Sequence, residues 1–176
     1  QSLVGSEMCI RDSPWSQLVE LGNIRLKALT ENQPIAIGAN VRVIPLRVPH
    51  RDEYSETVGY RIEGPRNTAL FIPDINKWDM WELLLEEELA NVDFAFLDAT
   101  FYDAVEVGHR DMAEIPHPFM VETMDRLKDA PESDKAKVHF IHLNHTNPCL
   151  DQSSQAYRSV LESGYRVAAF GQTFPL

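Results

Sequence analysis

The sequence predicts an α/β domain in which short buried strands alternate with helices. Three short apolar runs, residues 69–72, 94–97 and 138–143, have the composition of strands that are covered on both faces of a sheet. Residues 78–89, between the first two runs, place apolar side chains at helical spacing, and residues 119–127 predict a second helix. Strands that alternate with helices in this way are typical of layered α/β folds.

The elements before the first apolar run are a short helix and three strands. Ser13 and Pro14 have the residue types that cap and begin a helix. Strands are predicted from β-branched residues and from alternation of apolar with polar side chains over residues 35–37, 41–48 and 57–63.

The remaining segments complete a single domain. Residues 102–118 predict a loop and residues 130–134 a polar turn. A helix over residues 155–162 is expected to end at Gly164, and a last strand is expected over residues 165–170. No internal repeat or linker is present in the sequence, so residues 14–176 are predicted to form one domain.

The first thirteen residues do not follow these patterns. They read QSLVGSEMCIRDS and have neither the basic start nor the apolar centre of a signal peptide. The string resembles translated sequencing-adapter read-through. We therefore interpret residues 1–13, including Cys9, as a non-native tail, with a mobile N-terminal arm as the alternative.

The charge balance excludes several classes of partner. The chain has 16 Lys and Arg against 27 Asp and Glu, a formal net charge of −11. A surface this acidic repels phosphate backbones and anionic lipid headgroups. We therefore expect no nucleic-acid partner and no membrane association. Two cysteines cannot form a disulfide framework. The sequence therefore predicts a cytoplasmic protein, and its expected partner is a small-molecule substrate.

Chemistry-bearing side chains follow several of the predicted strands. Asp74, Asp98 and His142 lie at the ends of the three apolar runs, and His50 follows the strand over residues 41–48. His117 lies in the long loop between Pro116 and Pro118. Loops that follow strand ends are where α/β proteins place ligands and catalytic groups. Imidazole nitrogen and carboxylate oxygen together are ligands of Zn²⁺ and related metals, so these residues are candidates for a metal site.

Each candidate also has a structural interpretation. A single histidine in a strand is commonly a hydrogen-bonded core residue, and an aspartate at a strand end commonly caps a helix. His109 and His139 are assigned to such structural roles, whereas His145 either lines the same pocket or is exposed. Glu53 and Glu56 either orient the ring of the preceding histidine or are surface charges. No local HExxH or CxxC motif is present, so the residues alone indicate a possible His/Asp metal site and no more.

Five ordered strings carry a resemblance to a known family. VPHRDEYSETVGYRIEG, LFIPDINKW, FLDATFYD, IPHPF and FIHLNHTNPCL together resemble the C-terminal part of a metallo-β-lactamase-fold metallo-hydrolase. The last string, with SGYRVAAFGQ downstream, is similar to the coenzyme PQQ synthesis protein B-like branch. The resemblance implies an αββα sandwich built from two similar halves, with metal held in the cleft between the sheet edges.

The resemblance also implies roles for individual residues. His50, Asp74 and His142 correspond to metal ligands, with Asp74 bridging the metals and orienting the attacking hydroxide. His117 corresponds to a loop histidine that assists at the leaving group or binds substrate, and Asp98 to a polar residue that supports the site. The expected cofactor is one or two Zn²⁺ ions, with iron or manganese as alternatives.

The activity that the resemblance implies is hydrolysis of an ester, a lactone or a phosphodiester by metal-bound hydroxide. The alternatives are a metal-dependent oxidase or hydroxylase of the PQQ-biosynthesis type and a non-catalytic binding module that keeps the fold. The superfamily's N-terminal HxHxDH motif does not occur in these 176 residues. We therefore expect a C-terminal fragment with an incomplete N-terminal half, inactive on its own, with HxHxDH in the upstream sequence.

Overall fold

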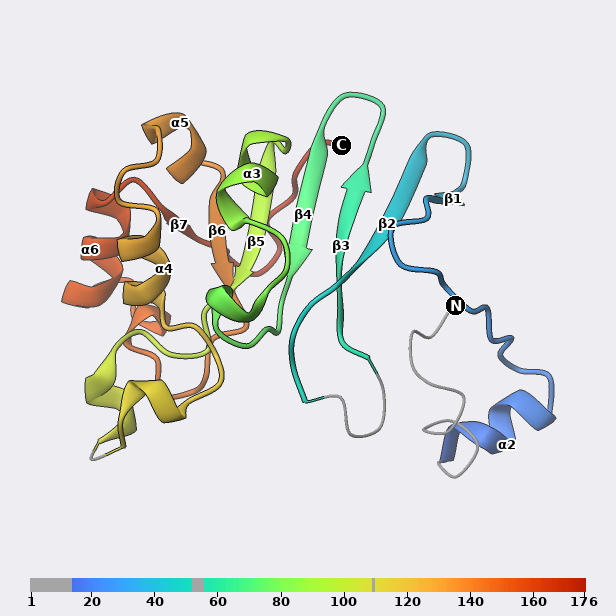
Figure 1. Ribbon diagram of the computed structural model, residues 1–176, viewed down its shortest axis with the longest axis horizontal. Helices are drawn as coiled ribbons and strands as arrows, with labels where there is room; N and C mark the ends of the chain where they lie inside the picture. The colour runs from blue at the N-terminus through green and yellow to red at the C-terminus, as the bar shows by residue number, and fades with distance from the viewer. Residues whose placement is uncertain (1–13, 52–55, 109) are drawn as a thin grey trace.

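A single seven-stranded sheet organises the part of the chain that the computed structural model describes, which is residues 14–51, 56–108 and 110–176 (Figure 1). Its strands lie in sequence order: β1 (Ile35–Ile37), β2 (Val41–Arg47), β3 (Val58–Glu63), β4 (Thr68–Ile72), β5 (Phe94–Asp98), β6 (Val138–Ile141) and β7 (Arg166–Val167). Neighbouring strands are antiparallel from β1 to β4 and parallel from β4 to β7.

Short helices connect the strands. The α-helices are α2 (Pro14–Glu20), α3 (Leu85–Ala90), α4 (Met120–Arg126), α5 (Glu132–Lys135) and α6 (Gln155–Glu162). The 3-10 helices are η1 (Trp78–Met80), η2 (Ala104–Val107), η3 (Met112–Glu114) and η4 (Pro148–Leu150). In Figure 1, α3 lies in front of β4 and β5, whereas α4 and α6 lie beside β6 and β7. Among the described residues, no helix has the length and apolar character needed to cross a membrane.

The main core fills the space between the sheet and these helices. Leu70, Leu97 and Phe140 come from three neighbouring strands and are at most 1% exposed. They belong to the same cluster as Leu85 of α3 and Met120 of α4. Complete burial of each of these side chains contributes roughly 1.5–3 kcal/mol. The core therefore fixes where β4, β5 and β6 end, and with them the residues that follow.

The other face of the sheet is partly covered by the end of the chain. Phe96 of β5 and His139 of β6 are paired across the two strands, and the ring of Phe174 lies 4.8 Å from each of their rings, centroid to centroid. Asn67, in the turn before β4, donates a hydrogen bond to the carbonyl of Pro175. Figure 1 shows the C-terminal segment passing behind the strands to reach this turn.

Most of the predicted strands are confirmed, but three segments differ. The run over residues 138–143 is strand only to Ile141, because His142 adopts a left-handed backbone with φ of 61°. The last strand is limited to two residues, Arg166–Val167. The polar turn over residues 130–134 instead contains the helix α5.

The continuous helix predicted over residues 78–89 is wrong. The segment forms η1 and α3 with extended backbone between them, as at Trp81, where φ is −81° and ψ is 133°. Trp78 donates its indole N–H to Thr123 of α4, and Trp81 donates its own to the carbonyl of Arg47 in β2. A continuous helix would direct side chains three residues apart toward the same side, and would not bring one indole to α4 and the other to β2.

One charged residue of α3 is buried rather than exposed to solvent. Glu88 is 8% exposed and forms an ion pair with Arg61 of β3. The helix α3 is thereby tied to the sheet by a shielded charge pair as well as by its apolar side chains. An alternating or amphipathic pattern does not reveal this pair, because the two residues are far apart in the sequence.

The burial of His139 predicts a pH dependence of stability. Burial lowers the pKa of His139 from its ordinary value of 6.5, although its bond to the carbonyl of Lys137 acts in the opposite direction. Below pH 6.5 the unfolded chain therefore binds a proton that the folded chain does not, and the free energy of unfolding falls. In His139→Phe this contribution is absent. Urea unfolding at pH 7.5 and pH 5.5 should show the variant gaining stability relative to the wild type at the lower pH, and a difference independent of pH would contradict the assignment.

Candidate metal centre

Four strands direct polar residues to the same edge of the sheet. The parallel strands β4, β5 and β6 end there, and β2 runs in the same direction because β3 is antiparallel to both β2 and β4. Asp74 lies two residues after β4, Asp98 ends β5, His142 follows β6 and His50 lies three residues after β2. Residues that are as much as 92 positions apart thereby become neighbours.

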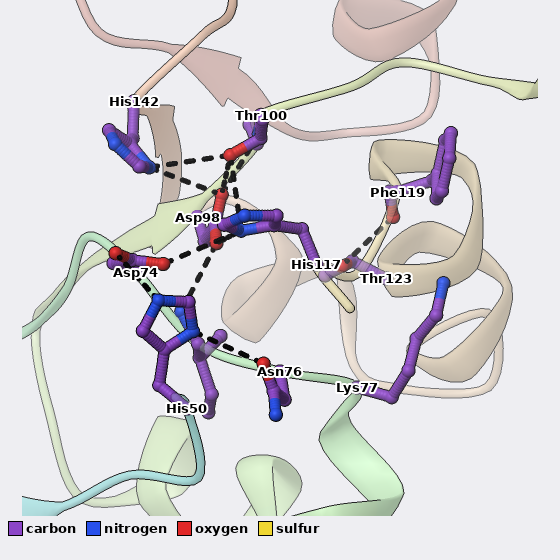
Figure 2. A network of polar contacts seen from close by, with 12 residues as sticks. His50, Asp74, Asn76, Lys77, Asp98, Thr100, His117, Phe119, Thr123 and His142 are labelled. Carbon is purple, nitrogen blue, oxygen red and sulfur yellow. Dashed lines mark hydrogen bonds and ion pairs between the residues drawn. The ribbon is translucent and has the colours of Figure 1, made fainter. Parts of the chain in front are cut away.

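The structure brings all five candidate residues into one cluster. Figure 2 shows their side chains directed toward one another, with His117 reaching the cluster from the loop before α4. The Nε2 atom of His50 lies 3.4 Å from Oδ2 of Asp74, and Oδ1 of Asp74 lies 3.5 Å from Nδ1 of His117. The Nδ1 atom of His142 lies 3.6 Å from Oδ1 of Asp98. The assignment of His50, Asp74 and His142 as ligands stays a prediction.

Asp98 lies at the base of the cluster and has no exposed surface. Its Oδ2 accepts hydrogen bonds from Nδ1 of His117 at 2.9 Å and from the N–H of Ile75 at 3.2 Å. Its Oδ1 accepts from both the N–H and the hydroxyl of Thr100. Burial raises the pKa of this carboxyl, but hydrogen bonds from His117, His142 and Thr100 outweigh burial and lower the pKa to about 2. Asp98 is therefore a carboxylate whose oxygens are already engaged.

The same carboxylate orients two histidines through the same ring atom. Nδ1 of His117 and Nδ1 of His142 both face Asp98. The interaction with Asp98 raises the pKa of His142, while burial opposes the rise and the charge of Asp74 adds to it. An imidazole whose Nδ1–H faces a carboxylate presents its Nε2 lone pair outward and is a better ligand and base. Both rings therefore leave Nε2 available.

His50 is oriented by an amide. Its Nδ1 lies 3.1 Å from Oδ1 of Asn76, which leaves Nε2 to face Asp74. Asn76 is held in turn, because its backbone N–H donates to the carbonyl of Pro49 at 2.7 Å. Asn76 and Thr100 are not among the candidates that the sequence patterns indicate. Their positions, each two residues after a candidate aspartate in a loop that follows a strand, were the available signal.

The remaining sequence candidates do not enter the cluster. His145 is exposed, and its Nδ1 lies 3.0 Å from the side-chain oxygen of Asn144. His139 is buried in β6 among aromatic rings, as its structural assignment predicted. Glu56 is exposed. Residues 1–13 with Cys9, and also Glu53 and His109, lie outside the described residues.

One carboxylate oxygen of the cluster is buried but has no hydrogen-bond donor among the described residues. Oδ1 of Asp74 is buried and accepts no hydrogen bond from any residue that the structure describes. A buried carboxylate oxygen without a donor is costly, and a cation beside it removes the cost. Asp74, Asp98 and His117 each offer a ligand atom, and these atoms lie within 4.8 Å of one another. Since the oxygens of Asp98 are engaged, the carboxylate oxygen that is free to accept a cation is that of Asp74, and carboxylate with imidazole suits zinc, iron or manganese.

The charge of Asp98 predicts a second pH effect. Its pKa of about 2 in the folded chain lies below the ordinary 3.8, so the stability that it contributes is complete above pH 3.8 and is lost as the pH falls toward 2. Asp98→Asn removes that contribution. In urea unfolding, we expect the variant to be less stable at pH 5 and its deficit to shrink by about 1 kcal/mol at pH 3. A deficit that stays constant would show that folding does not lower the pKa of Asp98.

The sequence of this chain matches that of known proteins. A family described as "Beta-lactamase superfamily domain" matches residues 4–142. Coenzyme PQQ synthesis protein B of Methylococcus capsulatus is 32% identical over 135 residues, which cover 70% of this chain and 42% of that protein. The chain therefore spans less than half the length of this curated relative.

Solved structures show the same fold. The zinc-bound PqqB of Methylobacterium extorquens superposes with a TM-score of 0.76 at 21% identity, over 99% of this chain and 64% of that chain. A diphosphatase from the PhnP family superposes with a TM-score of 0.57 at 19% identity, over 99% of this chain and 59% of that chain. The metallo-β-lactamase fold protein YhfI of Bacillus subtilis gives 0.56 at 16% identity, over 89% of this chain and 58% of that chain.

Proposed function

Because this chain belongs to the β-lactamase superfamily domain family, in its coenzyme PQQ synthesis protein B-like branch, we propose that it contributes half of a metal-dependent hydrolytic site. The observation that carries the proposal is the buried, unpartnered oxygen of Asp74 beside the imidazoles of His50 and His117. The proposed substrate is a small molecule with an ester, lactone or phosphodiester bond.

Three residues would hold the metal. His50 and His142 present Nε2, because Asn76 and Asp98 engage their Nδ1 atoms, and Asp74 presents its free oxygen. Zinc is the first choice, since the similar PqqB structure is described as zinc-bound, and iron and manganese suit the same atoms. A bound ion of this kind polarises the substrate's carbonyl or phosphoryl oxygen and lowers the pKa of water from 15.7 toward roughly 7.

The chain's own residues would orient the reactants and move a proton. Besides binding the metal, the carboxylate of Asp74 would orient the attacking water toward the substrate. His117 is 19% exposed, so its ring reaches both the cluster and solvent. With Nδ1 held by Asp98, its Nε2 would take up the proton that the attacking water loses and pass it to the leaving oxygen.

A second function is favoured by the sequence relationship. The 32% identity is to a protein named for coenzyme PQQ synthesis, which favours a metal-dependent oxidase or hydroxylase acting on a precursor of a quinone cofactor. Two histidines and one carboxylate, the set formed by His50, His142 and Asp74, are also the ligands of many iron oxygenases. Metal identity therefore separates the two proposals, since zinc favours hydrolysis and iron favours oxidation.

Metal content tests the proposed centre. The purified chain should retain zinc, iron or manganese in elemental analysis after equilibration with each ion and gel filtration. Asp74→Ala and His142→Ala remove proposed ligands, and each should weaken retention by about tenfold or more. His145→Ala is the matched control, because His145 lies three residues from His142 and is exposed. A wild-type chain that retains no metal, or an Asp74→Ala variant that retains as much as wild type, would refute the proposal.

A further inference from the structure

The segment Asp74–Trp78 connects the cluster to helix α4. Ile75 donates its N–H to Asp98, and Asn76 faces His50. The next two residues, Lys77 and Trp78, leave the cluster and bind α4. The position of this segment therefore influences the relative positions of the loops that surround the cluster.

We propose that Lys77 and Glu122 are positioning residues, whose ion pair holds the loop that carries His117 against the loop that carries Asp74. The inference rests on the metal centre proposed above. It adds two residues that lie outside the cluster and that contact none of the proposed ligands through an observed hydrogen bond or ion pair. Figure 2 shows Lys77 extended alongside the polypeptide that leads from His117 into α4.

The contact between the two side chains is short and partly shielded. Nζ of Lys77 lies 2.5 Å from Oε2 of Glu122, and the two side chains are 23% and 34% exposed. The ammonium also lies 4.7 Å from the centre of the Phe119 ring, where the face of the ring attracts a cation. A pair with this much protection from water interacts more strongly than one on the open surface.

Glu122 transmits the contact to His117. The oxygen that binds Lys77 also accepts the backbone N–H of Phe119 at 2.8 Å, at the start of α4. Phe119 is completely buried and lies two residues after His117. Between them is Pro118, whose ring restricts the backbone, so a shift at Phe119 is passed on to His117.

Lys77 transmits the contact to Asp74 through two residues that have little freedom. Ile75 is completely buried and its N–H is bound to Asp98. The N–H of Asn76 is bound to the carbonyl of Pro49. A displacement of Lys77 therefore reaches Asp74, and the 3.5 Å separation between Asp74 and His117 depends on both ends of the ion pair.

Uncharged hydrogen bonds also join the two segments, so the ion pair can be removed without unfolding the chain. Trp78 donates to the hydroxyl of Thr123 at 2.8 Å, and that hydroxyl donates to the carbonyl of Phe119 at 3.2 Å. Both Trp78 and Thr123 are buried, so they keep η1 packed on α4 when the charge pair is removed. Loss of Lys77 should therefore loosen the cluster without unfolding the chain.

The test compares matched variants of the whole chain. Lys77→Met keeps the alkyl stem over Phe119 but removes the ammonium, and Glu122→Gln keeps an acceptor for the Phe119 N–H but removes the charge. Lys77→Arg retains the cation. Lys128→Met is the control, because it changes the net charge as Lys77→Met does but breaks only an exposed pair with Asp125. Zinc affinity is measured by chelator competition, and the ring ¹⁵N signals of His117 are recorded in the metal-free chain.

We expect zinc to bind about tenfold more weakly to Lys77→Met and Glu122→Gln, and with near wild-type affinity to Lys77→Arg and Lys128→Met. The ring signals of His117 should shift in the first two variants only. Zinc binding and His117 signals that are unchanged in Lys77→Met and Glu122→Gln would overturn the inference and leave the metal centre standing. Equal weakening by Lys128→Met would also overturn it, because the effect would then come from net charge.

Failure of the metal centre gives a different result. If the wild-type chain binds none of zinc, iron and manganese, the proposed function fails, and the metal-free ring signals still decide the positioning role. A shift in Lys77→Met that Lys77→Arg reverses would support that role, and the absence of a shift would refute it. If Lys77→Met does not fold, Glu122→Gln supplies the same comparison, since it preserves the hydrogen bond at the start of α4.

Discussion

A carboxylate at the end of β5 keeps its negative charge although no part of its side chain reaches solvent, and the folded chain must compensate it from within. The groups that do so are the N–H of Ile75, both donors of Thr100 and the rings of His117 and His142. Each belongs to a loop that carries or flanks a candidate ligand. Satisfying one buried charge therefore fixes three loops together, and a half-satisfied arrangement would be strongly unfavourable.

The sheet supplies the coarse placement and the loops supply the fine placement. Packing of Leu70, Leu97 and Phe140 against the helices determines which edge of the sheet receives the ends of β4, β5 and β6. Side-chain hydrogen bonds then choose which ring nitrogen of each histidine faces inward. The hydrogen bonds depend on the strand ends that the core has placed, and they restrict each ring further because they weaken steeply with distance and angle.

Sequence patterns predicted the strands that end at the cluster because the apolar runs 69–72 and 94–97 are short, continuous and followed directly by polar residues. They also identified His50, Asp74, Asp98, His117 and His142 as the candidates, and these residues lie together. What the patterns could not provide were contacts between distant side chains. The indoles of Trp78 and Trp81 bind partners on α4 and β2 and so break the expected helix, and Glu88 is buried by its pairing with Arg61. Asn76 and Thr100 were missed for the same reason.

The left-handed backbone of His142 has an evolutionary consequence. At φ of 61° a β-carbon is crowded, and a residue other than glycine or asparagine is held there at a cost of roughly 1 kcal/mol or more. That turn ends the pairing of β6 and aims the imidazole at Asp98. Laboratory selection for thermal robustness alone would thus favour glycine or asparagine at this position and erase the ring. Thermal stability and the function of the imidazole therefore favour different residues at position 142. A histidine that is kept there under such selection would mark a lineage that is still selected for the function of this ring.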